Sequence, residues 1–469
     1  MSTPVVVQGT VVQPPAFGSS PQPISNNGAP ANVDHQPAKG GCKDPLFAIL
    51  FYINVAAIVA VAVVYGPNAF SDTAEFTYEG YLYAAVISAF FSLILSALGL
   101  AVLMAIPETM IKVSLIFVVV MSGVWAVMAF LSKSIFAGVL GLIFFALSLC
   151  YARAVWSRIP FAAVNMTTAV TAIKANLGVT VFAYLFTLLA AGWSLLWSIA
   201  VSGTMEQTFT CNAQGVCNAN YGLLFLLFLS FFFAHQVLQN SVHVTVAGVV
   251  GNWWVAPSEN GCCGRAVFNS FLRTVTTSFG SICFGSLIVA FLQALRALAD
   301  MARANDDGGI GACIAQCIIS CIASIMEYFN KWAFIYVGVY GFGYLEAGKS
   351  VFELFKNRGW EAIIADDLVG NALMLVSLVV GGIMGALALI FTKTTPWFDE
   401  AGGNDKAVAF FIGFVIGLAV CSILLSTVAS GVNTVIVMFA DAPADLQQNY
   451  PEISQKMRRI WSEIYPGSV

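Results

Sequence analysis

Residues 221–254 read YGLLFLLFLSFFFAHQVLQNSVHVTVAGVVGNWW. The first half of this stretch is an unbroken apolar run, and the whole exceeds the roughly twenty residues that a helix needs to cross a bilayer. The second half carries His235, Gln236, Gln239, Asn240 and His243 without a formal charge. Because an unpaired polar side chain is costly in hydrocarbon, we expect this half to face a bundle interior or a watery cavity.

The composition of the whole chain agrees with a membrane protein. Of the 469 residues, 59% are hydrophobic and only 9% are charged, with a mean hydropathy of +0.84. Soluble domains carry about 25% charged residues, so a water-soluble fold is excluded. The net charge of -4 and the lack of a basic stripe give no indication of a nucleic-acid partner. The fold class expected is an all-α, multi-pass membrane bundle whose immediate partners are lipids.

Runs of apolar residues divide the chain into about ten predicted membrane helices. An even number of spans puts both termini on one side, and most basic residues then fall on that side, so we expect cytosolic termini. The predicted spans are 45–65, 81–106, 112–131, 135–151, 177–201, 221–248, 278–298, 331–349, 367–392 and 407–440.

Three regions of the chain follow from these spans. Residues 1–42 hold seven of the sixteen prolines and few charges, which predicts a disordered cytosolic tail. Residues 43–440 form the transmembrane domain, and residues 441–469 form a cytosolic C-terminal tail. Between spans, segments 153–176 and 264–277 have the composition of helices that lie along the inner membrane surface.

Residues 310–330, IGACIAQCIISCIASIMEYFN, fit the span pattern least well. They either extend the eighth span, lie flat at an interface or cross the membrane once more. Cys313, Cys317 and Cys321 repeat every four residues and so share one helical face. No fourth donor lies nearby, which favours small-residue helix packing over a metal site.

The polar residues of the opening stretch are the first candidate binding group. Gln236, Asn240 and His243 follow one another at i, i+4 and i+7, so they share a helix face. They either join helices by hydrogen bonds or line a path for a solute, with a histidine able to exchange a proton near neutral pH. His235 and His243 are roughly 12 Å apart along the axis, too far to bind one metal by themselves.

A second candidate group begins at Asn330, in NKWAFIYVGVYGFGYLEAGKS. Tyr336, Tyr340 and Tyr344 repeat every four residues, and Glu346 is a carboxylate within the predicted span. Aromatic faces and a carboxylate suit an organic cation. An interfacial tyrosine belt, with Glu346 in cytosolic water, is the alternative.

Smaller features concern assembly and the outer loops. Cys211 and Cys217 lie in one predicted outer loop, where an oxidising compartment favours a disulfide between them. A GxxxG pair at Gly413 and Gly417 permits either tight helix packing or a homo-oligomer. No phosphate loop, zinc-protease motif or nucleophile elbow occurs, so we expect neither an enzyme nor a cofactor.

Four segments of the chain resemble the choline transporter-like family, solute carrier family 44, in order and spacing. The most specific elements are Asn330, Ala333, Tyr340 and Gly341, with a GSxxxGSL run beginning at Gly280. The segments are HQVLQNSVHVTVAGVVGNWW, TSFGSICFGSLIVAFLQALR, EYFNKWAFIYVGVYGFGYLEAGKSVFELFKNRGW and GVNTVIVMFADAP, in residues 235–254, 277–296, 327–360 and 431–443.

The resemblance implies a ten-span carrier in the plasma membrane. Its substrate would be choline or a related amine such as ethanolamine, moved by facilitated diffusion or in exchange for protons. The short first outer loop, GPNAFSDTAEFTYEG, is more similar to the fungal and protist branch, which includes the yeast pH-nine-sensitive protein. A carrier for a different small solute and a non-transporting membrane scaffold are the alternatives. As substrate-binding residues we predict Gln236, Asn240, His243, Asn330, Tyr336, Tyr340 and Glu346.

Overall fold

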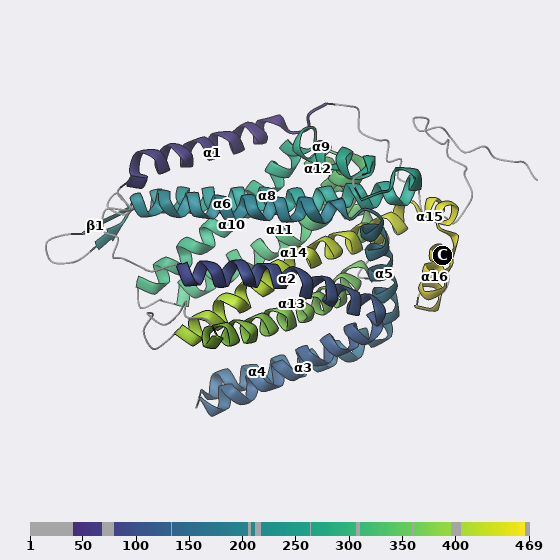
Figure 1. Cartoon of the computed structure of the whole chain (residues 1–469), viewed down its shortest axis with the longest axis horizontal. Coiled ribbons are helices and arrows are strands. Elements are labelled where there is room, and N and C mark those ends of the chain that lie inside the picture. Colours follow the sequence, from purple (N-terminus) through teal and green to yellow (C-terminus); the bar gives the residue numbers. More distant parts are fainter. Residues whose placement is uncertain are drawn as a thin grey trace, which may run out of the picture.

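A computed structural model describes residues 41–67, 79–132, 134–204, 208–211, 217–262, 264–305, 310–358, 361–394 and 405–464. These residues form a bundle of long helices that lie roughly side by side (Figure 1). The bundle helices are α1 (Pro45–Tyr65), α2 (Glu79–Ala105), α3 (Pro107–Leu131), α4 (Ile135–Val155), α6 (Gly178–Gly203), α8 (Tyr221–Val255), α10 (Phe279–Asn305), α11 (Ile310–Tyr340), α13 (Glu361–Thr394) and α14 (Asp405–Asp441).

Shorter elements mark the two ends of the bundle. At one end, strands β1 (Phe209–Cys211) and β2 (Cys217–Ala219) pair antiparallel between α6 and α8. The other end carries the remaining helices (Figure 1). These are η2 (Trp156–Arg158), α5 (Ile159–Ala175), η3 (Pro257–Glu259), α9 (Arg265–Val275), α12 (Tyr344–Arg358), α15 (Pro443–Asn449) and α16 (Pro451–Ile464).

The all-α membrane bundle is confirmed, because hydrocarbon leaves the backbone of a spanning segment no partner except its own helix. Within the described residues, nine helices are long and apolar enough to cross a membrane. The helix α11, with 31 residues, runs beside α8 and α10 as a further long member of the bundle (Figure 1). Ten crossings, with α11 as one of them, stay a prediction.

The predicted eighth span, residues 331–349, is wrong in its position. The helix α11 covers the whole ambiguous segment 310–330 and ends at Tyr340, and α12 begins only at Tyr344. Gly341 between them has a φ of 72°, a left-handed conformation that costs a residue with a side chain. Cys317 and Cys321 are exposed on α11, whereas the side chain of Cys313 lies outside the described residues.

The two ends of the described chain meet at the same end of the bundle. The backbone nitrogen of Lys43 donates to the carbonyl oxygen of Thr277, 2.9 Å away, at the turn between α9 and α10. At the other terminus, Trp254 donates from Nε1 to the carbonyl oxygen of Ala442 at 2.8 Å. This end carries the basic residues of α9, α12 and α16, so we take it as the cytosolic, inner end.

The inner-surface segments differ from one another. The helix α9 keeps Phe268 and Leu272 exposed, as an interfacial helix should. The helix α5 does not lie free on the membrane surface, because 12 of its 17 residues are buried beneath α14, α13 and α16. The C-terminal tail is helical to Ile464, and Trp461 packs edge-on against Phe161 of α5 with ring centroids 4.9 Å apart. Of the predicted N-terminal tail, residues 1–40 lie outside the described part.

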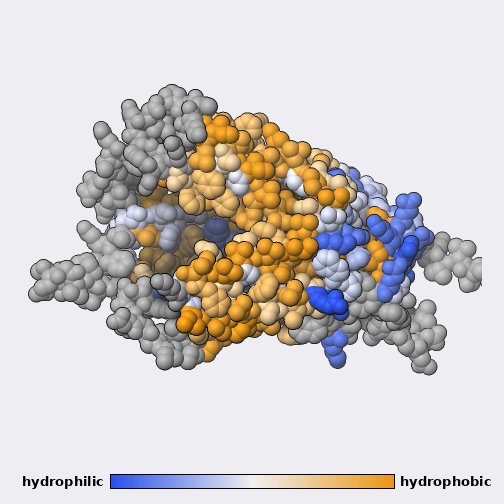
Figure 2. Space-filling model, turned by 90° about the horizontal axis from the view of Figure 1, so that it is seen from below, coloured by the Kyte–Doolittle hydropathy of each residue, from blue (hydrophilic) through white to orange (hydrophobic). Residues whose placement is uncertain are grey.

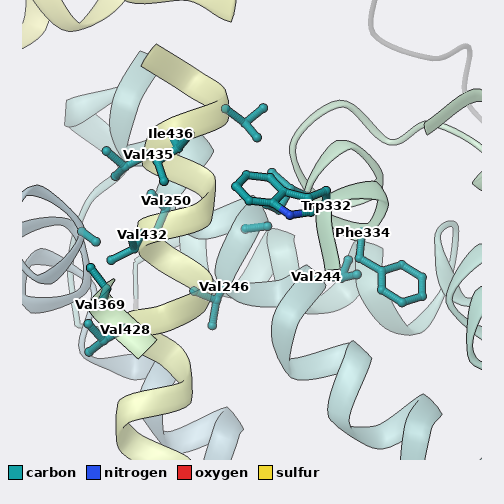
Figure 3. Packing of buried hydrophobic residues seen from close by; sticks show 14 of the residues in the cluster. Val244, Val246, Val250, Trp332, Phe334, Val369, Val428, Val432, Val435 and Ile436 are labelled. Carbon is teal, nitrogen blue, oxygen red and sulfur yellow. The ribbon is translucent and has the colours of Figure 1, made fainter. Parts of the chain in front are cut away.

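A buried apolar core lies where α8, α11, α13 and α14 meet (Figure 3). Branched side chains of α8 and α14 belong to this core, and so does Trp332 of α11, which is completely buried (Figure 3). The GxxxG pair of α14 serves packing within the chain, since Gly413 and Gly417 both lie against Met384 of α13. Homo-oligomer formation through that pair would therefore compete with the α13–α14 contact.

Candidate substrate path

One face of α11 carries a row of polar side chains along most of its length. Their spacing of four, four, three and four residues keeps them within one narrow helical face. The row consists of Gln316, Ser320, Ser324, Glu327 and Lys331. All five side chains are exposed or half-buried, although α11 lies within the bundle. Glu327 is about 26 Å from the outer end and about 20 Å from the inner end of this 31-residue helix at 1.5 Å per residue, so it lies near the middle of the helix.

The roughly opposite face of α11 is also exposed, but it is apolar. Ile318, Ile322 and Ile325 have exposed fractions of 54%, 45% and 61%. These isoleucines suit contact with lipid, whereas a carboxylate there would be expensive. Two exposed faces of opposite chemistry indicate that one faces lipid and the other faces a watery space. Figure 2 shows a hollow with hydrophilic residues inside it, towards the outer end of the otherwise hydrophobic surface.

The helix α10 contributes the neighbouring side of this path. Gln293 donates from Nε2 to Oε1 of Glu327 at 2.7 Å, near the middle of both helices. Nearer the outer end, Gln316 donates to the carboxylate of Asp300. The path therefore has carboxylates at its outer and middle levels, each held by an amide rather than by a fixed cation.

The inner end of the row is a charged pair with an aromatic neighbour. Lys331 forms an ion pair with Asp366 of α13, and its Nζ lies 4.7 Å from the ring centroid of Tyr328. The exposed side-chain fractions are 32% for Lys331 and 13% for Asp366. The pair is thus enclosed but still reachable from the space along α11.

His243 ties this inner end to two other helices. Its Nε2 lies 2.7 Å from the carbonyl oxygen of Lys331, and its Nδ1 lies 2.6 Å from Oγ of Ser430 on α14. A carbonyl oxygen only accepts, so Nε2 carries a proton and donates a hydrogen bond to the carbonyl oxygen of Lys331. In the neutral ring Nδ1 then accepts from the hydroxyl of Ser430.

The other predicted residues of α8 contact α10 instead. Asn240 donates from Nδ2 to Oγ of Ser286 at 2.9 Å and also contacts Oε1 of Gln236 at 3.3 Å. Both amides are half-buried. Gln236 and Asn240 therefore form one polar group with α10, and His243 forms another with α11 and α14.

The second predicted group also separates. Asn330 is buried, donates to the carbonyl oxygen of Gly285 at 2.7 Å and accepts from the hydroxyl of Tyr344. Tyr336 is buried and stacks on Tyr340, with centroids 5.8 Å apart. Tyr340 donates to Asp441 at 3.3 Å.

Glu346 lies apart from both predicted groups. It is exposed in the first turn of α12, beyond the break that follows α11. The predicted set is therefore distributed over several places.

The outer cysteine pair stays a prediction. Cys211 and Cys217 are directly opposed in the β1–β2 register, a placement whose usual Cα separation suits a disulfide. Their side chains lie outside the described part of the chain.

A tight closure lies at the inner end. The carboxylate of Asp44 accepts from Oγ of Ser281 at 2.6 Å and from the backbone nitrogen of Tyr344 at 3.0 Å, which joins α1, α10 and α12. Arg273 of α9 donates to the carbonyl oxygen of Gly338. Burial lowers the pKa of the Arg273 guanidinium.

Sequence reasoning missed Glu327, Lys331, Asp366 and Asp44 as members of these sites. The row on α11 had a signal, because its spacing is readable in residues 316–331. No sequence signal pointed to Asp44 or Asp366, because their partners are more than thirty residues away in sequence or on other helices.

Comparison with known proteins identifies the bundle. The profile of a family described as plasma-membrane choline transporter matches residues 139–444, which is more than half of the chain. The chain belongs to this choline transporter family. The matched range contains α8, α10, α11, α13 and α14, the helices that form the path and the core.

Curated fungal relatives match over most of their length. The chain is 29% identical to Protein PNS1 of Candida albicans over 455 residues, which cover 88% of this chain and 87% of the relative. It is 30% identical to Protein PNS1 of Mycosarcoma maydis, covering 91% and 84%. Protein PNS1 of Saccharomyces cerevisiae is 27% identical, covering 89% and 83%. The similarity to the fungal branch predicted from the short outer loop is confirmed.

Proposed function

We propose that this protein carries a small organic cation, choline or a related amine such as ethanolamine, across the plasma membrane. The observation that carries the proposal is the polar, partly exposed face of α11 within an apolar bundle. Asp300, Glu327 and Asp366 supply carboxylates along that face, and an acidic lining concentrates cations. Membership of the choline transporter family supports the same substrate class.

Transport by alternating access fits the distribution of polar contacts. The inner end is held by Asp44, Arg273 and Tyr340, while the hollow seen in Figure 2 lies towards the outer end. This arrangement suits a conformation that receives solute from outside. A return to the inner side would require the contacts of Asp44 to break.

Each predicted binding residue has a place in this proposal. Gln236, Asn240 and His243 are half-buried beside the path and are proposed to line its inner part. Asn330 and Tyr336 are buried supports of the adjoining helices, and Tyr340 belongs to the inner closure. Glu346 is proposed to meet the substrate only on the inner side, where it is exposed.

Uptake of labelled choline and ethanolamine into proteoliposomes tests the function. Accumulation of either amine is expected, and repeating the assay with an imposed pH gradient separates facilitated diffusion from proton exchange. The proposal fails if neither amine accumulates in folded, oriented protein.

The variant Glu327→Gln tests the path itself. Glutamine can still accept from Gln293, but the charge is lost. A unit charge about 5 Å away contributes roughly 0.8 kcal/mol in a water-like medium, so uptake at low choline should fall about fourfold. Glu346→Gln is the comparison at the inner side, and a larger loss there would move the decisive carboxylate to that side.

A further inference from the structure

We infer that Asp366 and the ring of Tyr328 form the site that binds the positive group of the transported cation, and that Lys331 fills this site with its own ammonium group when no substrate is present. The inference rests on the proposed transport of an organic cation. It adds the residues that recognise the charge and an occupant that substrate must displace.

The contacts of Lys331 are those expected of a bound organic cation. Its ammonium is paired with the carboxylate of Asp366 and lies 4.7 Å from the centroid of the Tyr328 ring. A carboxylate combined with an aromatic face is the chemistry by which proteins bind substituted ammonium ions. The site is therefore already assembled around a cation that belongs to the chain.

The position of the pair makes exchange with a substrate feasible. Lys331 ends the polar row of α11, and a third of its side chain remains exposed. A cation moving along Ser324 and Glu327 reaches Asp366 next. When the substrate is absent, the lysine keeps Asp366 from being an unpaired carboxylate among the helices, which would be strongly destabilising.

Exchange requires movement of the lysine side chain only. The backbone of Lys331 is fixed, because its carbonyl oxygen accepts from Nε2 of His243. The ammonium is attached through a flexible four-carbon stem, so it can leave Asp366 while α11 stays in place. His243 acts here as a positioning residue for the site.

The adjacent carboxylate provides a natural control. Asp367 is exposed, accepts from the hydroxyl of Tyr151 on α4 and accepts from Nδ2 of Asn371 at 3.2 Å. The hydrogen bonds of Asp367 are to α4 and to its own helix, whereas Asp366 pairs with Lys331 of α11. Asp367→Asn therefore makes the same chemical change one residue away, at a carboxylate that does not pair with Lys331.

The test compares four variants of the full chain in detergent and in proteoliposomes: Asp366→Asn, Lys331→Met, the double variant and Asp367→Asn. Choline binding is measured directly, and the thermal shift caused by tetramethylammonium reports occupancy independently of transport.

We expect Asp366→Asn to weaken choline binding about tenfold, equal to about 1.4 kcal/mol. Lys331→Met should bind choline more tightly than the unchanged chain, because the competing ammonium is gone. The double variant should behave as Asp366→Asn does, and Asp367→Asn should bind normally.

An ion pair with a purely structural role gives a different pattern. Both single variants would then weaken binding alike and the double variant would restore it, a result that overturns the inference. If Asp366→Asn does not fold, Lys331→Met decides: a larger tetramethylammonium shift than in the unchanged chain supports the site, and an equal or smaller shift overturns it. Uptake by the unchanged chain is scored separately. If the unchanged chain shows no uptake but Lys331→Met shows an enlarged tetramethylammonium shift, only the transport proposal is refuted. If uptake is normal but both single variants lose choline binding alike, only the cation site is refuted.

Discussion

The outer and inner parts of α11 carry polar groups in opposite ways. In the row from Gln316 to Lys331, all five polar side chains are exposed or half-buried, and their contacts with other helices are two amide–carboxylate hydrogen bonds and one ion pair. From Trp332 to Gly338 every residue is buried, and the carbonyl oxygen of Gly338 accepts from Arg273. Groups of the outer part can exchange partners with a solute at modest cost. Groups of the inner part hold neighbouring helices in place, and losing a partner there leaves a buried polar atom unpaired.

Filling the inner contact at Gly338 should have the largest effect on stability. A methyl group there would lie 2.6 Å from the carbonyl oxygen of Val244 and 2.8 Å from Cβ of Ala247, so α8 and α11 must separate. Gly338→Ala should destabilise the protein by about 1–3 kcal/mol, seen as a lower midpoint in thermal unfolding. Gly382→Ala is the control, because no neighbouring atom lies within 4 Å of its methyl position. Equal behaviour of the two variants would contradict the tight inner packing.

A loss of similar size is expected at Asp44. Asp44→Ala removes the acceptor of both Ser281 and the backbone nitrogen of Tyr344. A buried donor left without a partner costs about 1–3 kcal/mol, so thermal stability should fall. Asp44→Asn keeps an acceptor oxygen and should retain most of the stability. If alanine and asparagine are equally harmful, the charge of Asp44 rather than its hydrogen bonds is what matters.

The smallest change concerns the access of water to the outer part of α11. Ser324→Cys places a thiol on the polar face, and the natural Cys317 and Cys321, both exposed on α11, contribute to the background. A membrane-impermeant, cationic thiol reagent added from outside should label Ser324→Cys well above the background of the unchanged chain, because only the polar face meets water. Choline should slow this labelling. Labelling no greater than that background would mean that the face of Ser324 is closed to water.

Most of the bundle was predictable because a bilayer imposes one length and one polarity on nearly every span. The eighth span was misplaced for the same reason. Glu327, Asn330 and Lys331 lower the hydropathy of the true crossing, whereas residues 332–340 are apolar. The helix tolerates its charges because Gln293 and Asp366 reach them from α10 and α13.

The binding residues were predictable only in part. Gln236, Asn240 and His243 are half-buried on one helix, as their spacing suggested, but they contact two different sets of helices. The tyrosines grouped with Glu346 by sequence are divided by the turn at Gly341, which bends the chain before α12. The spacing of residues along the sequence shows which of them share a helix face, but not which neighbouring helices that face contacts.

The sequence by itself determined that this protein is a multi-pass helical bundle, which face of each helix is polar, and its membership of the choline transporter family. Hydropathy and helical spacing are local properties, so they can be read from the sequence without knowing which helices lie next to one another. Which side chains the polar face of α11 contacts, with Gln293 at Glu327 and Asp366 at Lys331, follows only from the packing of the helices. Those pairings join residues of separate helices, and their cost or benefit depends on how each charge is enclosed.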